Sequence, residues 1–199
     1  MIITSIHYSN TDTSEFTDIV KSTDFDAMIV MDNKYYYNNN HNYILQYNDD
    51  VGMDIVNTEN IKLNDLENTP KIIKSGVKTF TKPSLYFEVR PRSSLHKYGL
   101  IVANSPGTID PQYRGEIGMI LVKLFNHTKD IPNNVIKSGT RLCQLVLKPY
   151  IPLLSYDKVI NDFSNQIKIG IFYSNDVFNN WETLLKSDRG GNGYGSTDG

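Results

Sequence analysis

The chain has a single cysteine, no long run of apolar residues and no excess of charge of either sign. Among its 199 residues, 20 basic and 22 acidic side chains leave a formal net charge of −2. So balanced a charge provides no overall attraction to nucleic acid or to an anionic membrane, and neither is expected as a partner. A polyanionic ligand would have to be bound by a local group of donors.

The longest apolar run lies between Ile117 and Phe125, and Lys123 interrupts it. It is far shorter than the roughly 18 residues that a membrane-spanning helix requires. The first residues also lack the basic segment and apolar stretch of a secretory signal, so the sequence predicts a soluble, intracellular protein. The lone Cys143 has no partner for an internal disulfide, and we expect it to be a small core residue rather than a nucleophile.

The first two stretches of the chain differ in composition. Residues 1–47 are rich in Asn, Asp and Tyr, and we interpret them as an N-terminal extension or insertion. Residues 48–150 alternate short β-branched and aromatic segments with turn residues, which is typical of an all-β barrel or sandwich. The strands expected there are 71–79, 84–90, 100–103, 116–125 and 141–148.

The remaining residues divide at Arg189. Residues 151–188 combine an insertion with a segment whose apolar residues recur with helical period, namely Val177, Phe178, Trp181, Leu184 and Leu185. Ser174 and Asn175 precede this segment and are suitable caps, so one short amphipathic helix is predicted. Residues 189–199 contain five glycines and are expected to form a flexible C-terminal arm.

Two polar blocks offer groups for a phosphorylated ligand. Arg92 provides a planar fork of donors, and Ser93 and Ser94 add hydroxyls and backbone amides directly after a predicted strand. Alternatively, this block is an ordinary solvated turn that binds no ligand. Gln144 is the only polar residue in the apolar half of a later strand, where its amide needs hydrogen-bond partners. Either a ligand or a neighbouring strand would satisfy it.

A polar turn between two apolar strands carries a further group. Asn104 lies six residues before Asp110, and Tyr113 follows three residues after it. An amide, a carboxylate and a ring can thus surround one small ligand, although the turn could equally be an ordinary one in which Asp110 bonds its own backbone. In the glycine-rich tail, Arg189 and backbone amides could surround an anion while Tyr194 offers a face to a base, or the tail could be disordered.

Five blocks of the sequence, taken in their order along the chain, resemble the five motifs of the homotrimeric dUTPase family. The third block, Gly107-Thr-Ile-Asp-Pro-Gln-Tyr-Arg-Gly-Glu-Ile117, is the most specific match. The other four are similar to the remaining motifs: Val51-Gly-Met-Asp54-Ile, Arg90-Pro-Arg-Ser-Ser-Leu95, Gly139-Thr-Arg-Leu-Cys-Gln-Leu145, and Arg189 to Thr197. The resemblance covers about 48–150 and 178–197 and implies a dUTPase-like β-barrel or jelly-roll-type fold.

The resemblance implies an enzyme of nucleotide metabolism that hydrolyses dUTP to dUMP and pyrophosphate, keeping uracil out of DNA and supplying dUMP. It implies that Asp110 is the general base for the water that attacks the α-phosphorus. It further implies that Mg²⁺ arrives on the triphosphate, with Asp54 reaching the metal through water.

Substrate-binding roles follow from the same resemblance. Asn104 would read the uracil edge, and the Tyr113 ring would pack against the deoxyribose and reject a 2′-hydroxyl. The full set of expected substrate-binding residues is Arg92, Ser93, Ser94, Asn104, Gly107, Tyr113, Gln144, Arg189, Tyr194, Gly195, Ser196 and Thr197. In a homotrimer with active sites at its subunit interfaces, the tail of another subunit would close over the site.

The chain departs from the family pattern at Thr140, Asn192 and Tyr194. Asn192 replaces a glycine, so a left-handed backbone there would carry strain. Two other functions are considered. A dCTP deaminase would need an acid on the strand after the third block, but Ile120 and Lys123 occupy the counted positions. A non-catalytic nucleotide-sensing or partner-binding module would keep the fold without turnover.

Overall fold

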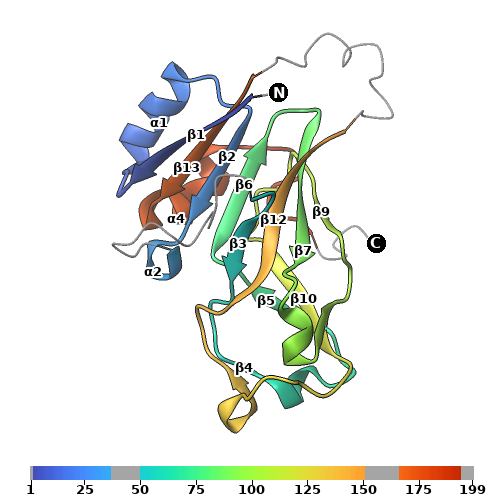
Figure 1. Ribbon diagram of the computed structural model, residues 1–199. Helices are drawn as coiled ribbons and strands as arrows, with labels where there is room; N and C mark the ends of the chain where they lie inside the picture. Colours follow the sequence, from blue (N-terminus) through green and yellow to red (C-terminus); the bar gives the residue numbers. More distant parts are fainter. Residues whose placement is uncertain (1, 37–49, 151–165, 194–199) are drawn as a thin grey trace.

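The computed structural model describes residues 2–36, 50–150 and 166–193, which are mostly β (Figure 1). The strands of the described residues form four sheets and no closed barrel. Their orders are β1 (Ile2–Ser9), β13 (Gln166–Tyr173), β2 (Ala27–Met31) and β6 (Val77–Thr81); β5 (Lys71–Lys74), β10 (Gly118–Lys123) and β8 (Leu100–Val102); β11 (Val135–Ile136) and β4 (Ile61–Lys62); and β3 (Met53–Val56), β12 (Arg141–Pro149), β7 (Leu85–Pro91) and β9 (Gly107–Ile109). The expectation of a β fold is thus confirmed, and no closed barrel is found among the described residues.

Three α-helices occur in this part of the chain, so the prediction of only one helix is wrong. They are α1 (Thr13–Ser22), α2 (Asn33–Tyr36) and α4 (Asn175–Leu184). The predicted amphipathic segment is confirmed as α4. Its N-cap is Ser174, whose hydroxyl oxygen accepts a hydrogen bond of 3.1 Å from the Val177 backbone N–H, as a serine cap is expected to do.

Both chain ends contribute to one parallel layer, which explains the extra helices. Strand β13 lies between β1 and β2 and is parallel to both, with Tyr8 paired to Phe172 and Val30 paired to the same residue. Parallel strands of one sheet need a long crossover connection, and α1 supplies the one that joins β1 to β2 on the other side of β13. Because β1 and β2 find their parallel partner β13 about 140 residues or more away, local composition did not reveal this part of the sheet.

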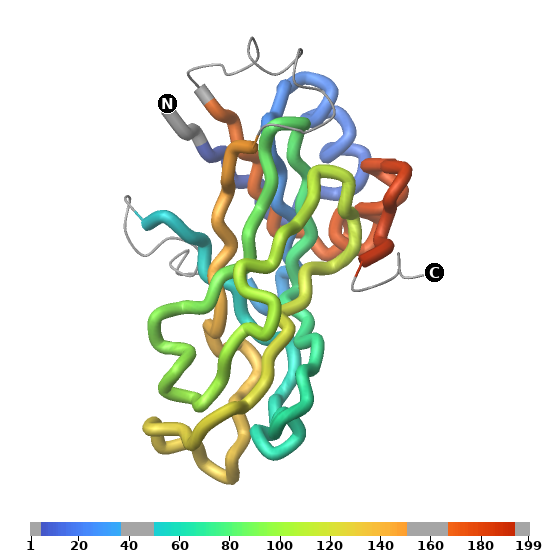
Figure 2. Tube along the Cα trace, turned by 90° about the vertical axis from the view of Figure 1, so that its right-hand side faces the viewer, coloured from blue at the N-terminus to red at the C-terminus, as the bar shows by residue number. Residues whose placement is uncertain are grey.

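The described residues have two hydrophobic cores. The larger core fills the β body, while the smaller one lies between the parallel layer and its two longer helices. The smaller core consists of Phe16, Phe25, Met28, Val30, Phe172, Val177 and Trp181. Figure 2 shows the result as an elongated β body with the helices from both chain ends gathered at one end. Val177 and Trp181 of α4 are buried in this core, which stabilises the helix on the sheet.

The central strands of the β body match their predictions closely. Strands 84–90, 100–103, 116–125 and 141–148 are confirmed as β7, β8, β10 and β12, with ends that agree to within two residues. The predicted strand 71–79 is divided, because the chain leaves one sheet at Lys74 and enters another at Val77. Gly76 lies between them with φ +67°, a conformation that a side chain would strain.

Candidate active site

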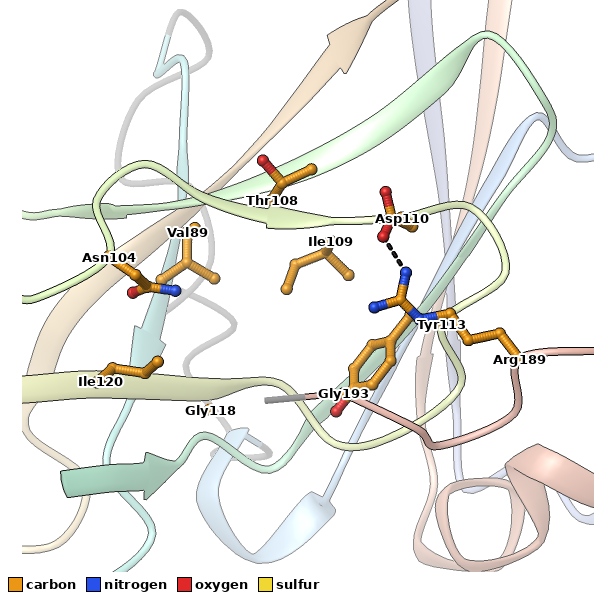
Figure 3. Close-up of a pocket in the computed structure, with 11 residues that line it drawn as sticks. Val89, Asn104, Thr108, Ile109, Asp110, Tyr113, Gly118, Ile120, Arg189 and Gly193 are labelled. Atoms are coloured by element: carbon orange, nitrogen blue, oxygen red, sulfur yellow. Dashed lines mark hydrogen bonds and ion pairs between the residues drawn. The ribbon is translucent and has the colours of Figure 1, made fainter. Parts of the chain in front are cut away.

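A pocket opens where the chain leaves β9 at the edge of its sheet (Figure 3). Strand β9 pairs with β7 in antiparallel register, with Ile109 opposite Phe87, so Asp110 is the first residue beyond the paired strand. The pocket has a volume of about 150 Å³. The residues that line it are Val89, Asn104, Gly107, Thr108, Ile109, Asp110, Tyr113, Gly118, Ile120, Arg189 and Gly193. Five residues predicted from separate blocks thus meet at one cavity.

Tyr113 forms one wall of this pocket, and its ring is held on several sides. Only 6% of the residue is exposed, its hydroxyl donates to the Glu116 carbonyl at 3.0 Å, and its backbone N–H donates to the Asp110 carbonyl at 3.0 Å. A Cβ on Gly115 would lie 2.5 Å from the Tyr113 hydroxyl, and one on Gly193 would lie 2.9 Å from Tyr113 Cε2. Glycine is therefore required on both sides of the ring.

Asp110 meets the C-terminal arm in the same pocket. Arg189 Nη1 pairs with Asp110 Oδ2, and the Arg189 guanidinium lies 5.9 Å from the centre of the Tyr113 ring. The two side chains are 47% and 36% exposed, so solvent reaches the pair. Asn104 lies at the other end of the pocket, where a Cβ on Gly107 would approach its Nδ2 to 3.2 Å. One end of the pocket therefore carries the carboxylate of Asp110 and the guanidinium of Arg189, and the other end carries the amide of Asn104.

A second pocket, of about 190 Å³, collects the other predicted residues. Its lining is Asp50, Val51, Gly52, Asp54, Arg92, Ser93 and Gln144. The register of β12 places Gln144 opposite both Asp54 and Arg90, which brings the three blocks together. No residue lines both this pocket and the pocket of Asp110. Within one subunit, the predicted site is therefore divided in two.

Asp54 of the second pocket is paired with two arginines. Arg92 Nε lies 2.7 Å from Asp54 Oδ1, and Arg141 Nη1 lies 3.2 Å from Oδ2. Burial raises the pKa of Asp54 above its ordinary value, and the two guanidinium groups oppose that shift. Gln144 donates from Nε2 to the Pro91 carbonyl at 3.2 Å. A Cβ on Gly52 would lie 2.3 Å from Gln144 Oε1, so the amide is packed directly against the backbone.

Ser94 stands apart from these two groups. Ser94 is the N-cap of a short 3-10 helix, Leu95–Tyr98, and lies outside the lining of both pockets. Tyr194, Gly195, Ser196 and Thr197 lie outside the described residues. Asn192 does not have positive φ, so the strain expected at that position is absent.

Arg114 is a site residue that the sequence reading missed. Only 4% of it is exposed, and its guanidinium donates to the carbonyls of Leu185, Pro111 and Tyr113. The available signal was its place inside the most specific block, directly after Tyr113. Its guanidinium is bonded to protein carbonyls, one of them 71 residues away, and no local sequence pattern indicates such a partner.

The described residues contain no group of three or more His, Cys, Asp or Glu side chains arranged to hold a metal ion. No helix in this part of the chain is long and apolar enough to cross a membrane.

Comparison with known proteins shows the family of this chain. A profile of the dUTPase family matches residues 38–166. The deoxyuridine 5′-triphosphate nucleotidohydrolase of Clostridium novyi (strain NT) is 34% identical over 149 residues, covering 74% of this chain and 84% of the relative. That of Crocosphaera subtropica (strain ATCC 51142 / BH68) is 38% identical over 107 residues, covering 53% of this chain and 70% of the relative.

Among solved structures, a variant dUTPase of Staphylococcus bacteriophage 80alpha with dUpNHpp has a TM-score of 0.50. It is 20% identical, and the match covers 86% of this chain and 97% of that one. The protein is therefore a nucleotide hydrolase with a mostly β, dUTPase-like fold. The chain belongs to the dUTPase family. It is a dUTP diphosphatase, which hydrolyses dUTP to dUMP and pyrophosphate in nucleotide metabolism.

Proposed function

We propose that Asp110 is the general base of this hydrolysis and that the pocket beside it takes the deoxyuridine. The carboxylate accepts a proton from water, the water oxygen bonds to the α-phosphorus, and the bond to the bridging oxygen breaks to release pyrophosphate. The observation that carries this proposal is the meeting of Asn104, Asp110, Tyr113 and Arg189 at one cavity. Half of the Asp110 side chain faces solvent, so water can reach it.

The nucleoside end of the pocket supports selection of a deoxyuridine. Asn104 offers both a donor and an acceptor to the uracil edge, and Gly107 leaves room for the base beside it. The Tyr113 ring would pack on the deoxyribose face. Its hydroxyl is bound to the Glu116 carbonyl, so the ring cannot swing away to admit a 2′-hydroxyl.

The phosphates would be held by Arg92, Ser93, Ser94 and Gln144. Because these residues lie apart from Asp110 within one subunit, a complete site needs the second pocket of a neighbour. We therefore propose a homotrimer with its active sites at the subunit interfaces. Arg189 would move to the phosphates, and Tyr194, Gly195, Ser196 and Thr197 would add a ring on uracil and further donors.

The family generally uses Mg²⁺, and the donor set of this chain fits a metal that arrives on the triphosphate. Both carboxylate oxygens of Asp54 already accept from arginines, so direct coordination would have to displace a guanidinium. Asp54 would instead contact the metal through a bound water. When bound, Mg²⁺ compensates the charge of the phosphates. An intracellular location is proposed because dUTP arises inside cells.

Turnover of dUTP by the Asp110→Asn variant tests the role of the base. Release of pyrophosphate should fall by about 10²- to 10⁴-fold, while binding of dUTP stays largely intact. Asp65→Asn is the matched control, since Asp65 is a surface carboxylate paired with Lys71 at 3.9 Å. Full activity in Asp110→Asn would exclude Asp110 as the base. Binding of dUTP without pyrophosphate release by the wild-type chain would favour the non-catalytic module.

A further inference from the structure

We propose that Ser75 and Glu116 are positioning residues that fix the sugar wall of the nucleoside pocket. They act on residues 115–118, which we call the support segment, and through it on the ring of Tyr113. Because that ring is taken as the group that packs on the deoxyribose, the proposal rests on the proposed function. It adds two residues that line neither pocket to the determinants of selection between dUTP and UTP.

The support segment forms a surface against which the Tyr113 ring lies. A Cβ on Gly115 would be 2.5 Å from the Tyr113 hydroxyl oxygen and 3.0 Å from its Cε2. At the other end of the segment, Gly118 lines the nucleoside pocket itself. Because ring atoms as well as the hydroxyl lie against Gly115, a shift of this backbone would move the ring.

The support segment is bonded to residues 75–77, the corner between β5 and β6. The Ile117 carbonyl accepts from the Ser75 hydroxyl at 2.6 Å and from the Ser75 backbone N–H at 3.1 Å. The Ile117 backbone N–H donates to the Val77 carbonyl at 2.8 Å. All three residues are fully buried, so water does not compete for these bonds. Both polar groups of the Ile117 backbone are thus held by the corner.

Glu116 makes a further bond between the same two segments. Its Oε1 accepts from the Gly76 backbone N–H at 2.8 Å. A charged acceptor makes this bond stronger than one between neutral groups. Lys74 Nζ lies 3.7 Å from Oε2, but the Lys74 side chain is 72% exposed, so this ion pair contributes little. The main partner of the carboxylate is therefore the backbone of the corner.

The corner is itself fixed by the N-terminal segment. The buried Tyr36 hydroxyl donates to the Ser75 carbonyl at 2.5 Å and accepts from the Val56 backbone N–H at 3.0 Å. The Gly76 carbonyl accepts from the Asp32 backbone N–H at 2.9 Å. Because the corner is bonded on both sides, it forms a rigid base for the support segment.

The position of the ring affects UTP and dUTP differently. UTP carries one more hydroxyl at the sugar face, so an outward shift of the Tyr113 ring relieves the collision with UTP and weakens the packing on dUTP. A variant that only destabilises the fold lowers the amount of active enzyme equally for both nucleotides. The ratio of the two kcat/KM values therefore reports the position of the ring and is insensitive to stability.

Steady-state kinetics of Glu116→Ala with both nucleotides test the proposal. The ratio of kcat/KM for UTP to that for dUTP should rise by about 3- to 10-fold, with a raised KM for dUTP. Ser75→Ala keeps its backbone bond to Ile117, so its ratio should rise less but in the same direction. Glu116→Gln should restore the wild-type ratio, because its amide oxygen still accepts from the Gly76 N–H.

Two surface variants are the matched controls. Glu67 also joins a loop to β10, through Lys123 at 2.6 Å, and lines neither pocket, so Glu67→Ala should keep the wild-type ratio. Lys74→Met removes only the exposed ion pair with Glu116 and should do the same. Trp181 emission should stay unchanged in every variant, which shows that each one folds.

Tyr113→Ala separates a failure of this proposal from a failure of the proposed function. If it raises the ratio while Glu116→Ala and Ser75→Ala leave the ratio unchanged, this proposal alone is overturned. An effect of only one of these two variants removes the other residue from the proposal. If Tyr113→Ala leaves the ratio unchanged, the role of Tyr113 in the proposed function fails, and this proposal fails with it.

The double variant Tyr113→Ala with Glu116→Ala completes the test. Once the ring is gone, nothing remains for Glu116 to position, so the ratio should equal that of Tyr113→Ala alone. A further rise in the double variant would show that Glu116 acts on selection by another route, which would overturn the proposal.

Discussion

Arg189 and Asp110 form an ion pair although 79 residues separate them along the chain. The pair covers the carboxylate that we propose as the base, and a triphosphate carries more negative charge than one carboxylate. Binding of dUTP should therefore draw Arg189 toward the phosphates and free Asp110 to accept a proton. One residue of the arm would thereby couple substrate binding to exposure of the base.

Replacing Arg114 should impair catalysis because the arm loses its attachment to the turn that carries Asp110. In Arg114→Lys the charge remains, but one ammonium group cannot reproduce the bonds from Nε and Nη1 to Leu185 and Pro111. We expect kcat/KM to fall by about 10- to 100-fold because the arm and Asp110 lose their fixed geometry. Steady-state kinetics should show a raised KM together with a lowered kcat.

A double-mutant cycle separates this positioning role from a merely structural one. If Arg114 acts through the arm, the losses from Arg114→Lys and Arg189→Ala should overlap and deviate from additivity by about 0.5 kcal/mol or more. Arg90→Lys is the matched control, since Arg90 pairs with Glu88 and lines neither pocket. Trp181 emission should stay unchanged in each variant. Strict additivity would count against the role assigned to Arg114.

Tyr113 should govern discrimination between dUTP and UTP. In Tyr113→Ala the ring that would collide with a 2′-hydroxyl is gone, so the ratio of kcat/KM for UTP to that for dUTP should rise by about 10- to 100-fold. Tyr113→Phe keeps the ring but loses the bond to the Glu116 carbonyl. It should retain the discrimination and lower the free energy of unfolding by about 1 kcal/mol. Unchanged selectivity in Tyr113→Ala would assign selection to another residue.

Two glycines of the arm should respond differently to alanine. A Cβ on Gly193 would lie 2.9 Å from Tyr113 Cε2, so Gly193→Ala should lift the arm from the pocket and raise the KM for dUTP. The nearest atoms to a Cβ on Gly191 are the Glu182 carboxylate oxygens at 3.2 and 3.3 Å, which can rotate away. Gly191→Ala should therefore behave almost as the wild type. Equal KM values in both variants would contradict this difference.

Cys143 should make the fold sensitive to alkaline pH. Burial raises the pKa of its thiol to about 12, whereas the unfolded chain loses that proton at about pH 8.5. The native state thus binds more protons between these values, so the free energy of unfolding should fall as the pH rises through this range. Urea titrations at pH 8 and pH 10.5 should show a smaller decrease in Cys143→Ala, since the tyrosines affect both proteins equally. An identical decrease would refute the contribution of Cys143.

Several parts of the fold and site were predictable because their signals are local. The apolar period after Ser174 predicted α4, and the β-branched and aromatic segments 84–90 and 141–148, bounded by turn residues, predicted β7 and β12. The polar segment on both sides of β9 also has a local signature, and Asn104, Asp110 and Tyr113 indeed line one pocket. The roles of these residues in dUTP hydrolysis stay proposals until the variants above are measured.

Other parts depended on pairings between distant residues. The segment that contains β1 and β2 looked like an extension because its strands lie about 140 residues or more from β13, with no turn to link them. The importance of Arg114 was equally hidden, since its partners include a carbonyl 71 residues away. A local pattern reports backbone preference and side-chain type. It does not report which distant carbonyl a guanidinium will meet.

By itself, the sequence determined the chemical groups available to this enzyme and the order in which they occur, because motif residues and strand periodicity are properties of short segments. Only the tertiary structure decided that these groups divide between two separate pockets and that the arm contacts the turn that carries Asp110. Those outcomes depend on how the parallel layer packs around Trp181 and where α4 consequently ends. Packing of that kind depends on contacts between residues far apart in the chain, so no single segment determines it.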